Sequence, residues 1–288
     1  MPINSVDIPD QPLHVAAVQM ISTDDWQENL RKIKLMLDSM AQLPAPRLVQ
    51  LPENALCFGA SAQRALAMQP EACLPQLAGL AEYYRCYLQV GSFPMALRGD
   101  GAATDGRLRS ASLVFGPDGT LLSRYDKIHL FDVDVADAQG GYRESDTFEP
   151  GEQIQLCQIE QWCIGLGICY DLRFPELFLN LRAAGCHVLT VPSAFTAVTG
   201  EAHWEALLRA RAIETQSYVI AANQGGRHSE TRETWGHSMV IDPWGKVIAA
   251  CGKGEGVISA VLEPELLAKV RREMPLQQHR RLSFRIPE

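Results

Sequence analysis

Cys169 lies at a point in the sequence where a nucleophile could form. The stretch GLGICYDLRFPEL (residues 165–177) is an apolar run that breaks at this cysteine, and Pro175 follows where the first turn of a helix tolerates a missing N–H. A strand-to-helix junction is therefore predicted at Cys169, where free N–H groups and a helix dipole could lower the pKa of the thiol and bind an oxyanion. The alternative is an inert buried thiol, since cysteine is among the most buried residue types.

Three charged residues could assist such a cysteine. Glu53 follows a predicted buried strand in LPENA, so that its carboxylate would emerge at the carboxyl edge of a sheet. Lys127 comes where a predicted hairpin ends, in YDKIH, and Glu144 lies in the polar loop GYRESD. Each has an ordinary interpretation when taken alone, because acidic residues after strands, single lysines and polar loops mostly face solvent. Their use in catalysis depends on whether the fold brings them to Cys169.

The elements that must position these residues are predicted from hydrophobic periodicity. Strands and helices alternate in the first third of the chain, at residues 14–19, 26–40, 48–51, 75–85 and 88–93. Two hairpins follow at 110–125 and 154–168, and alternation then returns with a helix to 184, a strand at 188–191, a helix at 203–215 and a strand at 218–222. A hairpin at 239–249, a strand at 256–262 and a helix at 264–272 complete the set. This inventory predicts an α/β fold of two mixed sheets with helices outside them.

Composition limits the possible partners. The 288 residues include 34 acidic and 26 basic side chains, and the resulting net charge of −8 disfavours a nucleic-acid partner. Residues 1–12 lack the basic and apolar regions of a signal peptide, and no apolar run is long enough to span a membrane. We therefore expect a cytoplasmic protein without membrane contact.

Cysteine and histidine spacing argues against disulfides and metal sites. The eight cysteines lie in apolar contexts without a CxxC pair, which favours reduced thiols. The seven histidines show no HExxH pattern, so we expect no metal. No shift in composition marks a boundary, and a single domain over residues 1–288 is expected.

Several motifs together resemble a known family. Glu53 in LPEN, Lys127 in YDKIHLFD and Cys169 in GLGICYDLRFPEL have the order and spacing of a Glu-Lys-Cys triad. With YRES around Glu144 and the later GHSMVIDPWG, they resemble the nitrilase superfamily of carbon–nitrogen hydrolases. The resemblance covers about residues 13–283 and implies a four-layer αββα sandwich that commonly dimerises.

The same resemblance implies hydrolysis of linear amides through a thioester, without a cofactor. Cys169 would attack the amide carbonyl, and Lys127 with the backbone N–H of Tyr170 would stabilise the oxyanion. Glu53 would carry a proton to the leaving amine and then activate water. Glu144 is implied as a second acid that orients Lys127 or Glu53.

Residues 192–228 and the segment MPLQQHRR resemble the amidase branch that acts on deaminated glutathione, a small-molecule amide with an α-keto acid at its acyl end. Such an anion needs a cation, and Arg173, four residues after the nucleophile, is the candidate. Arg173 could equally be structural and pair with Asp171 or Glu176.

Phe195 and Thr196 follow the strand at 188–191 and are expected at the same sheet edge, beside the substrate. The alternatives are an omega-amidase that acts on α-ketoglutaramate, an N-carbamoyl amidohydrolase, and a non-hydrolytic interaction or redox-sensing protein in which Cys169 is reactive but not catalytic. A homodimer is also expected, from the resemblance and from the apolar helix at 203–215 with Trp204, Leu207, Leu208 and Ile213.

Overall fold

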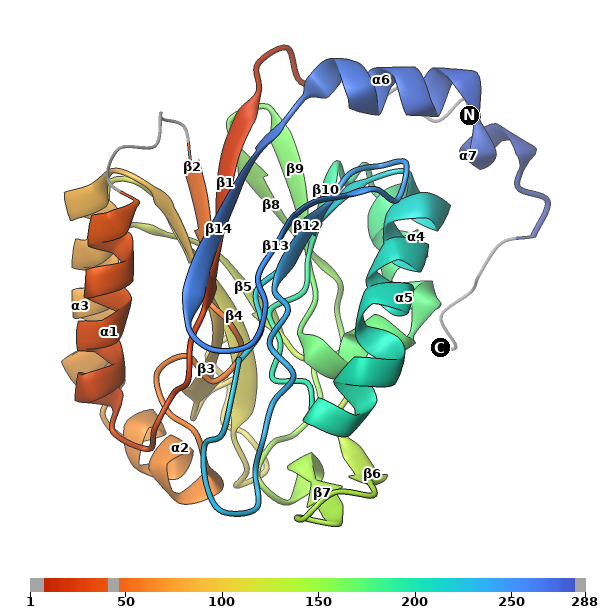
Figure 1. Cartoon of the computed structure of the whole chain (residues 1–288). Helices are drawn as coiled ribbons and strands as arrows, with labels where there is room; N and C mark the ends of the chain where they lie inside the picture. Colours follow the sequence, from red (N-terminus) through yellow and green to blue (C-terminus); the bar gives the residue numbers. More distant parts are fainter. Residues whose placement is uncertain (1–7, 41–46, 283–288) are drawn as a thin grey trace.

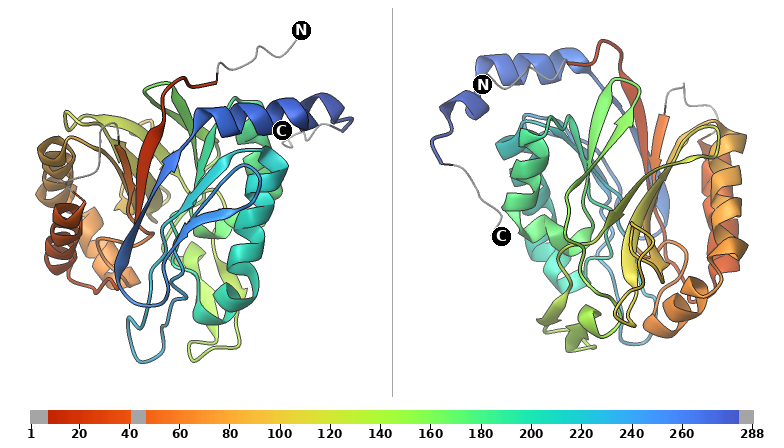
Figure 2. Two further views of the ribbon diagram at one scale, coloured as in Figure 1. Left: turned by 45° about the horizontal axis from the view of Figure 1, so that its top comes forward. Right: turned by 180° about the vertical axis from the view of Figure 1, so that it is seen from behind.

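The computed structural model describes residues 8–40 and 47–282. Two six-stranded sheets pack face to face, and helices cover the outer face of each sheet, so that the layers follow the order helix, sheet, sheet, helix (Figure 1). The two views of Figure 2 show the same four layers from other sides, with the last helices extending along one edge of the sandwich. The four-layer αββα sandwich predicted for the chain is confirmed.

The first sheet combines parallel and antiparallel strands. In spatial order these are β14 (Gly256–Leu262), β1 (Leu13–Gln19), β2 (Arg47–Gln50), β3 (Tyr87–Met95), β4 (Arg109–Phe115) and β5 (Leu121–Asp126). The three strands β1 to β3 run parallel, and β14, β4 and β5 are antiparallel to their neighbours. The outer face of this sheet is covered by α1 (Trp26–Ser39) and α3 (Pro70–Tyr84), and α2 (Ala60–Ala67) lies at one end (Figure 1).

The second sheet holds the strand before Cys169. Its strands in spatial order are β13 (Val247–Ala250), β12 (Met239–Ile241), β11 (Tyr218–Ala221), β10 (Val188–Thr190), β9 (Trp162–Leu166) and β8 (Gln155–Ile159). Its outer face is covered by α4 (Pro175–Ala183) and α5 (Ala197–Thr215). The remaining elements are the β6–β7 hairpin (Asp132–Asp134 and Gly141–Arg143), the short helices η1 (Glu144–Asp146) and η2 (Cys169–Arg173), and α6 (Pro264–Glu273) and α7 (Leu276–His279).

The two sheets are joined by hydrogen bonds as well as by apolar packing. Gln89 of β3 donates through Nε2 to Oγ1 of Thr190 in β10 at 3.0 Å. Gln50 of β2 accepts the backbone N–H of Ala222, just after β11, at 2.6 Å and donates to Gln89 at 3.1 Å. These fully buried glutamines lie within the apolar interior, where a hydrogen bond of fixed direction opposes sliding of one sheet over the other.

Most predicted elements are present, but some begin elsewhere. Helix α3 begins at Pro70 and contains Pro75, which had suggested the start of the helix. Helix α5 begins at Ala197, because the side chain of Thr196 caps it by accepting the N–H of Thr199. The short helix α2 and the β6–β7 hairpin were not predicted, since neither has enough residues for a clear apolar period.

Candidate active site

Cys169 occupies a tightly held turn after β9. Its φ is +47°, in the left-handed region that costs a residue other than glycine about 1 kcal/mol or more. Its N–H donates to the carbonyl of Pro192 at 2.9 Å, and the N–H of Ile168 donates to the carboxylate of Asp171 at 2.8 Å. These contacts fix the strained backbone and set the direction of the thiol.

The expected lowering of the thiol pKa does not occur. Burial raises the pKa of Cys169 well above its ordinary value, and the charge of Glu53 raises it further, while Lys127 and the N–H of Ala194 oppose both effects. A cation and an N–H donor are present, but Lys127 and Ala194 supply them from outside the turn, and they do not compensate for the loss of solvent. Cys169 is therefore a neutral thiol at rest, and a base must remove its proton during attack.

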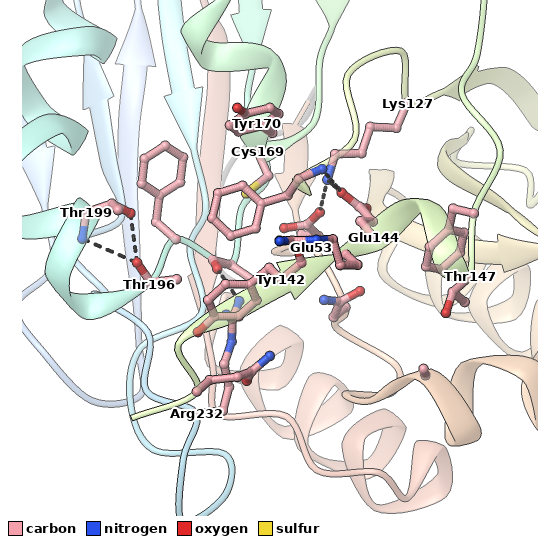
Figure 3. A pocket seen from close by; sticks show the side chains of 18 of the residues that line it. Glu53, Lys127, Tyr142, Glu144, Thr147, Cys169, Tyr170, Thr196, Thr199 and Arg232 are labelled. Atoms are coloured by element: carbon pink, nitrogen blue, oxygen red, sulfur yellow. Dashed lines mark hydrogen bonds and ion pairs between the residues drawn. The ribbon is translucent and has the colours of Figure 1, made fainter. Parts of the chain in front are cut away.

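A buried lysine between two carboxylates lies beside Cys169 (Figure 3). The Nζ of Lys127 donates to Oε1 of Glu53 at 2.7 Å and to both carboxylate oxygens of Glu144 at 2.9 Å. The charge of Glu53 also acts on the thiol of Cys169 and raises its pKa. The four predicted catalytic side chains therefore lie together in one buried part of the pocket.

Opposite charges within this group act on the pKa values of Lys127 and Glu144. Burial alone would lower the pKa of Lys127, but the carboxylates of Glu144 and Glu53 outweigh burial and hold the pKa well above its usual value. The pKa of Glu144 is raised by burial, and Lys127 opposes this rise. Lys127 thus stays protonated and can offer positive charge and hydrogen bonds to a developing oxyanion.

Glu53 is placed by the loop after β2. Its backbone carbonyl accepts a hydrogen bond from Nε2 of Gln224 at 2.9 Å. The same loop passes so close to Gly91 of β3 that a Cβ there would lie 2.3 Å from the carbonyl oxygen of Pro52. Glycine is therefore required at position 91, because any side chain would push the loop that carries the carboxylate.

Asp171 connects the Cys169 turn to the strand end that carries Lys127. Its carboxylate accepts hydrogen bonds from the hydroxyl of Tyr125 at 2.8 Å and from the backbone N–H of His129 at 3.1 Å, residues that flank Lys127 on either side. Nδ1 of His129 lies 2.7 Å from the same carboxylate. Asp171 is fully buried, and it ties the nucleophile to its cation although the two come from different sheets.

All eight predicted site residues line one pocket, namely Glu53, Lys127, Glu144, Cys169, Tyr170, Arg173, Phe195 and Thr196. Arg173 makes neither of the ion pairs considered for it, since its Nη1 lies 3.2 Å from Nδ1 of His203, and its guanidinium stands over the rings of Tyr170 and Phe195. Thr196 caps α5 besides lining the pocket.

The pocket also contains residues that were not predicted. Tyr142 of β7 and Arg232 of a polar loop both face it (Figure 3). Arg232 carries no signal in the sequence, because it lies in the hydrophilic stretch HSETRET, where an arginine is usually exposed. Only the folding of this loop over the pocket brings it to the site.

Two kinds of feature are missing from residues 8–40 and 47–282. No group of three His, Cys, Asp or Glu side chains is arranged to hold a metal ion. No helix in these ranges combines the length and the apolar character needed to cross a membrane.

Known proteins provide an independent comparison. Residues 14–272 match the model of the carbon-nitrogen hydrolase family. Deaminated glutathione amidase of Yersinia enterocolitica is 43% identical over 93% of this chain and 93% of its own, and omega-amidase NIT2 of Xenopus tropicalis is 37% identical over 93% and 94%. The crystal structure of Saccharomyces cerevisiae Nit3, a member of branch 10 of the nitrilase superfamily, matches with a TM-score of 0.84 and 32% identity over 96% of this chain and 99% of that chain. The chain therefore belongs to the carbon-nitrogen hydrolase family of the nitrilase superfamily and is a hydrolase that acts on carbon–nitrogen bonds.

Proposed function

We propose that this chain hydrolyses deaminated glutathione to α-ketoglutarate and cysteinylglycine, with Cys169 as the nucleophile. The observation that carries this proposal is the arrangement of Lys127 between Glu53 and Glu144 beside the thiol. Three arginines also line the pocket; Arg143 pairs with Asp134, whereas Arg173 and Arg232 form no ion pair with the described residues. Substrates with carboxylates at both ends match those arginines. Relatives named deaminated glutathione amidase support the choice of substrate.

The first half-reaction forms a thioester. Glu53 takes the proton of Cys169 as the sulfur attacks the amide carbonyl, because the raised thiol pKa leaves little thiolate at rest. Lys127 and the backbone N–H of Tyr170 stabilise the oxyanion of the tetrahedral intermediate. Collapse of this intermediate breaks the carbon–nitrogen bond, and the leaving amine takes the proton from Glu53.

The second half-reaction restores the enzyme. Glu53 removes a proton from water, the hydroxide attacks the thioester carbonyl, and the same donors stabilise the second oxyanion. Collapse releases the acid and the sulfur of Cys169, which recovers its proton from Glu53. Glu144 keeps Lys127 oriented throughout through its two contacts with Nζ.

Competition between two substrates tests the proposed substrate. Deaminated glutathione and α-ketoglutaramate share an acyl half, but the second has only ammonia as its leaving group. Contacts with cysteinylglycine lower the transition state, so we expect kcat/KM to favour deaminated glutathione by about tenfold to two-hundredfold. Both products are measured by mass, with Cys169→Ala as the blank. Equal or reversed values would make the chain an omega-amidase, like its Xenopus relative.

We also propose that the chain forms a homodimer through the outer face of α5. Ile213 on this helix is 48% exposed, and the exposed Trp244 lies in the adjacent turn, whose Gly245 is in close contact with Ile213. Trp204 and Leu208, which had also suggested an interface, are fully buried in the core of the chain itself and do not contribute. The proposal therefore depends on a smaller apolar surface than the sequence suggested.

Light scattering tests the dimer. We expect a mass of twice the 31.8 kDa of one chain at micromolar concentration, and a shift toward the single-chain mass in Ile213→Asp. Leu35→Asp is the matched control, because Leu35 is at least as exposed as Ile213 but lies on α1, in the opposite outer layer. A monomeric parent protein, or equal shifts in the two variants, would contradict this interface.

We further propose a cytoplasmic location, where the eight free thiols of the chain, including the nucleophile, would remain reduced. Recovery of the active enzyme in an oxidising compartment after cell fractionation would contradict it.

A further inference from the structure

Arg232 presents unused hydrogen-bond donors inside the active-site pocket. Its Nη2 donates to the carbonyl of Ala194 at 3.0 Å, whereas Nε and Nη1 are buried without a hydrogen-bond partner. No carboxylate of the described residues lies within 4.0 Å of its guanidinium. Buried N–H groups of a charged side chain are costly to leave unpaired, so this arrangement indicates a missing anionic partner.

The neighbours of Arg232 hold it in place without an ion pair, although the charge of Arg232 contributes to the lowered pKa of Asp137. Its guanidinium stands over the ring of Tyr142 at 4.4 Å and over that of Phe58 at 5.6 Å. The hydroxyl of Tyr142 donates to the carboxylate of Asp137 at 2.7 Å, so the ring is fixed by its own polar contact. A guanidinium oriented by aromatic rings is ready to bind a planar carboxylate through two N–H groups.

A single residue connects Arg232 to the nucleophile. The backbone N–H of Ala194 acts on the thiol of Cys169 and lowers its pKa, and the carbonyl of Ala194 accepts a hydrogen bond from Arg232. Arg232 and Cys169 therefore both lie next to Ala194, and both line the same pocket (Figure 3).

Arg173 occupies a different position in the same pocket. Its hydrogen-bond partner is His203, an exposed residue of the outer helix α5, and the contact itself is exposed. Its guanidinium covers the rings of Tyr170 and Phe195 from that side. Arg173 thus lies toward solvent, where a leaving group departs.

We propose that Arg232 binds the keto-acid carboxylate of the acyl half, and that Arg173 binds the glycine carboxylate of the leaving dipeptide. This assignment rests on the proposed function and moves Arg173 from the acyl end, where the sequence had suggested it, to the leaving-group end. The acyl carboxylate lies only three carbon atoms from the reacting carbonyl, which suits the arginine linked to Cys169 through Ala194. The glycine carboxylate lies beyond a whole cysteine residue, which suits the arginine at the mouth.

Matched substrates and variants test the assignment. Arg232→Gln and Arg173→Gln are assayed with deaminated glutathione, with α-ketoglutaramate, and with levulinoyl-cysteinylglycine, in which a methyl group replaces the acyl carboxylate. A hydrogen bond to a charged group is worth roughly 10- to 150-fold in kcat/KM. We expect Arg232→Gln to impose a loss of that size on both keto-acid substrates and a much smaller loss on the levulinoyl compound. Arg173→Gln should cost deaminated glutathione much more than α-ketoglutaramate.

Controls separate recognition from folding. Arg227→Gln changes an exposed arginine of the same loop and should leave all three substrates unaffected. Arg232→Lys keeps the charge and should recover part of the keto-acid activity, and circular dichroism checks that each variant is folded. Equal losses for keto-acid and levulinoyl substrates in Arg232→Gln would overturn the assignment of the acyl carboxylate. A larger effect of Arg173→Gln on α-ketoglutaramate would reverse the two ends.

A binding measurement distinguishes failure of this inference from failure of the proposed function. If the parent protein hydrolyses no keto-acid amide, the proposed function is wrong. Calorimetry with α-ketoglutarate and Cys169→Ala then tests Arg232 without turnover. We expect binding to weaken by roughly 10- to 150-fold when Arg232→Gln is added. Unchanged affinity, or no binding by Cys169→Ala itself, would overturn the role of Arg232.

Discussion

Two parts of the pocket differ in how fully their charged atoms are paired. We call Lys127, Glu53 and Glu144 the floor of the pocket, and Arg232 its wall. On the floor, the charged atoms of Lys127, Glu53 and Glu144 contact one another at 2.7–2.9 Å. On the wall, two nitrogen atoms of Arg232, Nε and Nη1, remain buried and unpaired. The difference teaches that the groups that perform the reaction are organised before the substrate arrives, whereas the group that recognises the substrate depends on the substrate to complete its contacts.

Replacement of Lys127, the cation that is bonded to both carboxylates of the floor, is the strongest test of this comparison. Lys127→Met leaves two buried carboxylates without their shared partner, and we expect a loss of about 3–5 kcal/mol in the free energy of unfolding. Turnover should fall by at least about a hundredfold to a thousandfold, since an oxyanion donor is lost. The destabilisation should grow as pH rises, because burial raises the pKa of Glu144, and without Lys127 to oppose this rise the folded state binds a proton there that it loses at higher pH. Urea unfolding at several pH values and steady-state kinetics measure these effects.

Two controls belong to that test. Lys246→Met removes an exposed lysine and should change neither property. Cys169→Ala should abolish turnover but retain the stability, since the ion pairs of Lys127 do not include the thiol. If Lys127→Met kept turnover within tenfold of the parent protein, the floor would not be the catalytic group.

A variant with a smaller expected effect distinguishes the two roles of Glu53, which are to raise the pKa of the thiol and to transfer protons during turnover. Its charge raises the pKa of Cys169, second only to burial, so Glu53→Gln should lower that pKa while it impairs turnover. We expect the pH midpoint of alkylation at Cys169 by iodoacetamide to fall by about one unit or more. Peptide mapping follows the label, and the half-exposed Cys251 serves as an internal reference. A midpoint that stays in place or rises would show that Glu53 does not act on the thiol.

Much of the active site could be predicted from the sequence, and the features that could not be predicted depend on tertiary packing. The strand that ends before Cys169 and the residues Glu53 and Lys127 after strands followed from local periodicity and from turn residues. The direction of the Cys169 pKa shift did not, because it depends on how completely the turn is buried. Arg232 was also hidden, since its place in the pocket comes from the packing of a loop against Tyr142, more than 80 residues away by sequence numbering.

The hydrogen bonds between the sheets have a consequence for how this enzyme can diverge. Glu53 and Lys127 come from the first sheet and Cys169 from the second, so the alignment that Gln50 and Gln89 enforce sets the distance between base and nucleophile. Mutations that shift this alignment would disturb every substrate alike. Mutations in the loop of Arg232 change recognition and leave that distance intact. New substrate preferences are therefore accessible through the loops alone, while the sandwich beneath them stays constant.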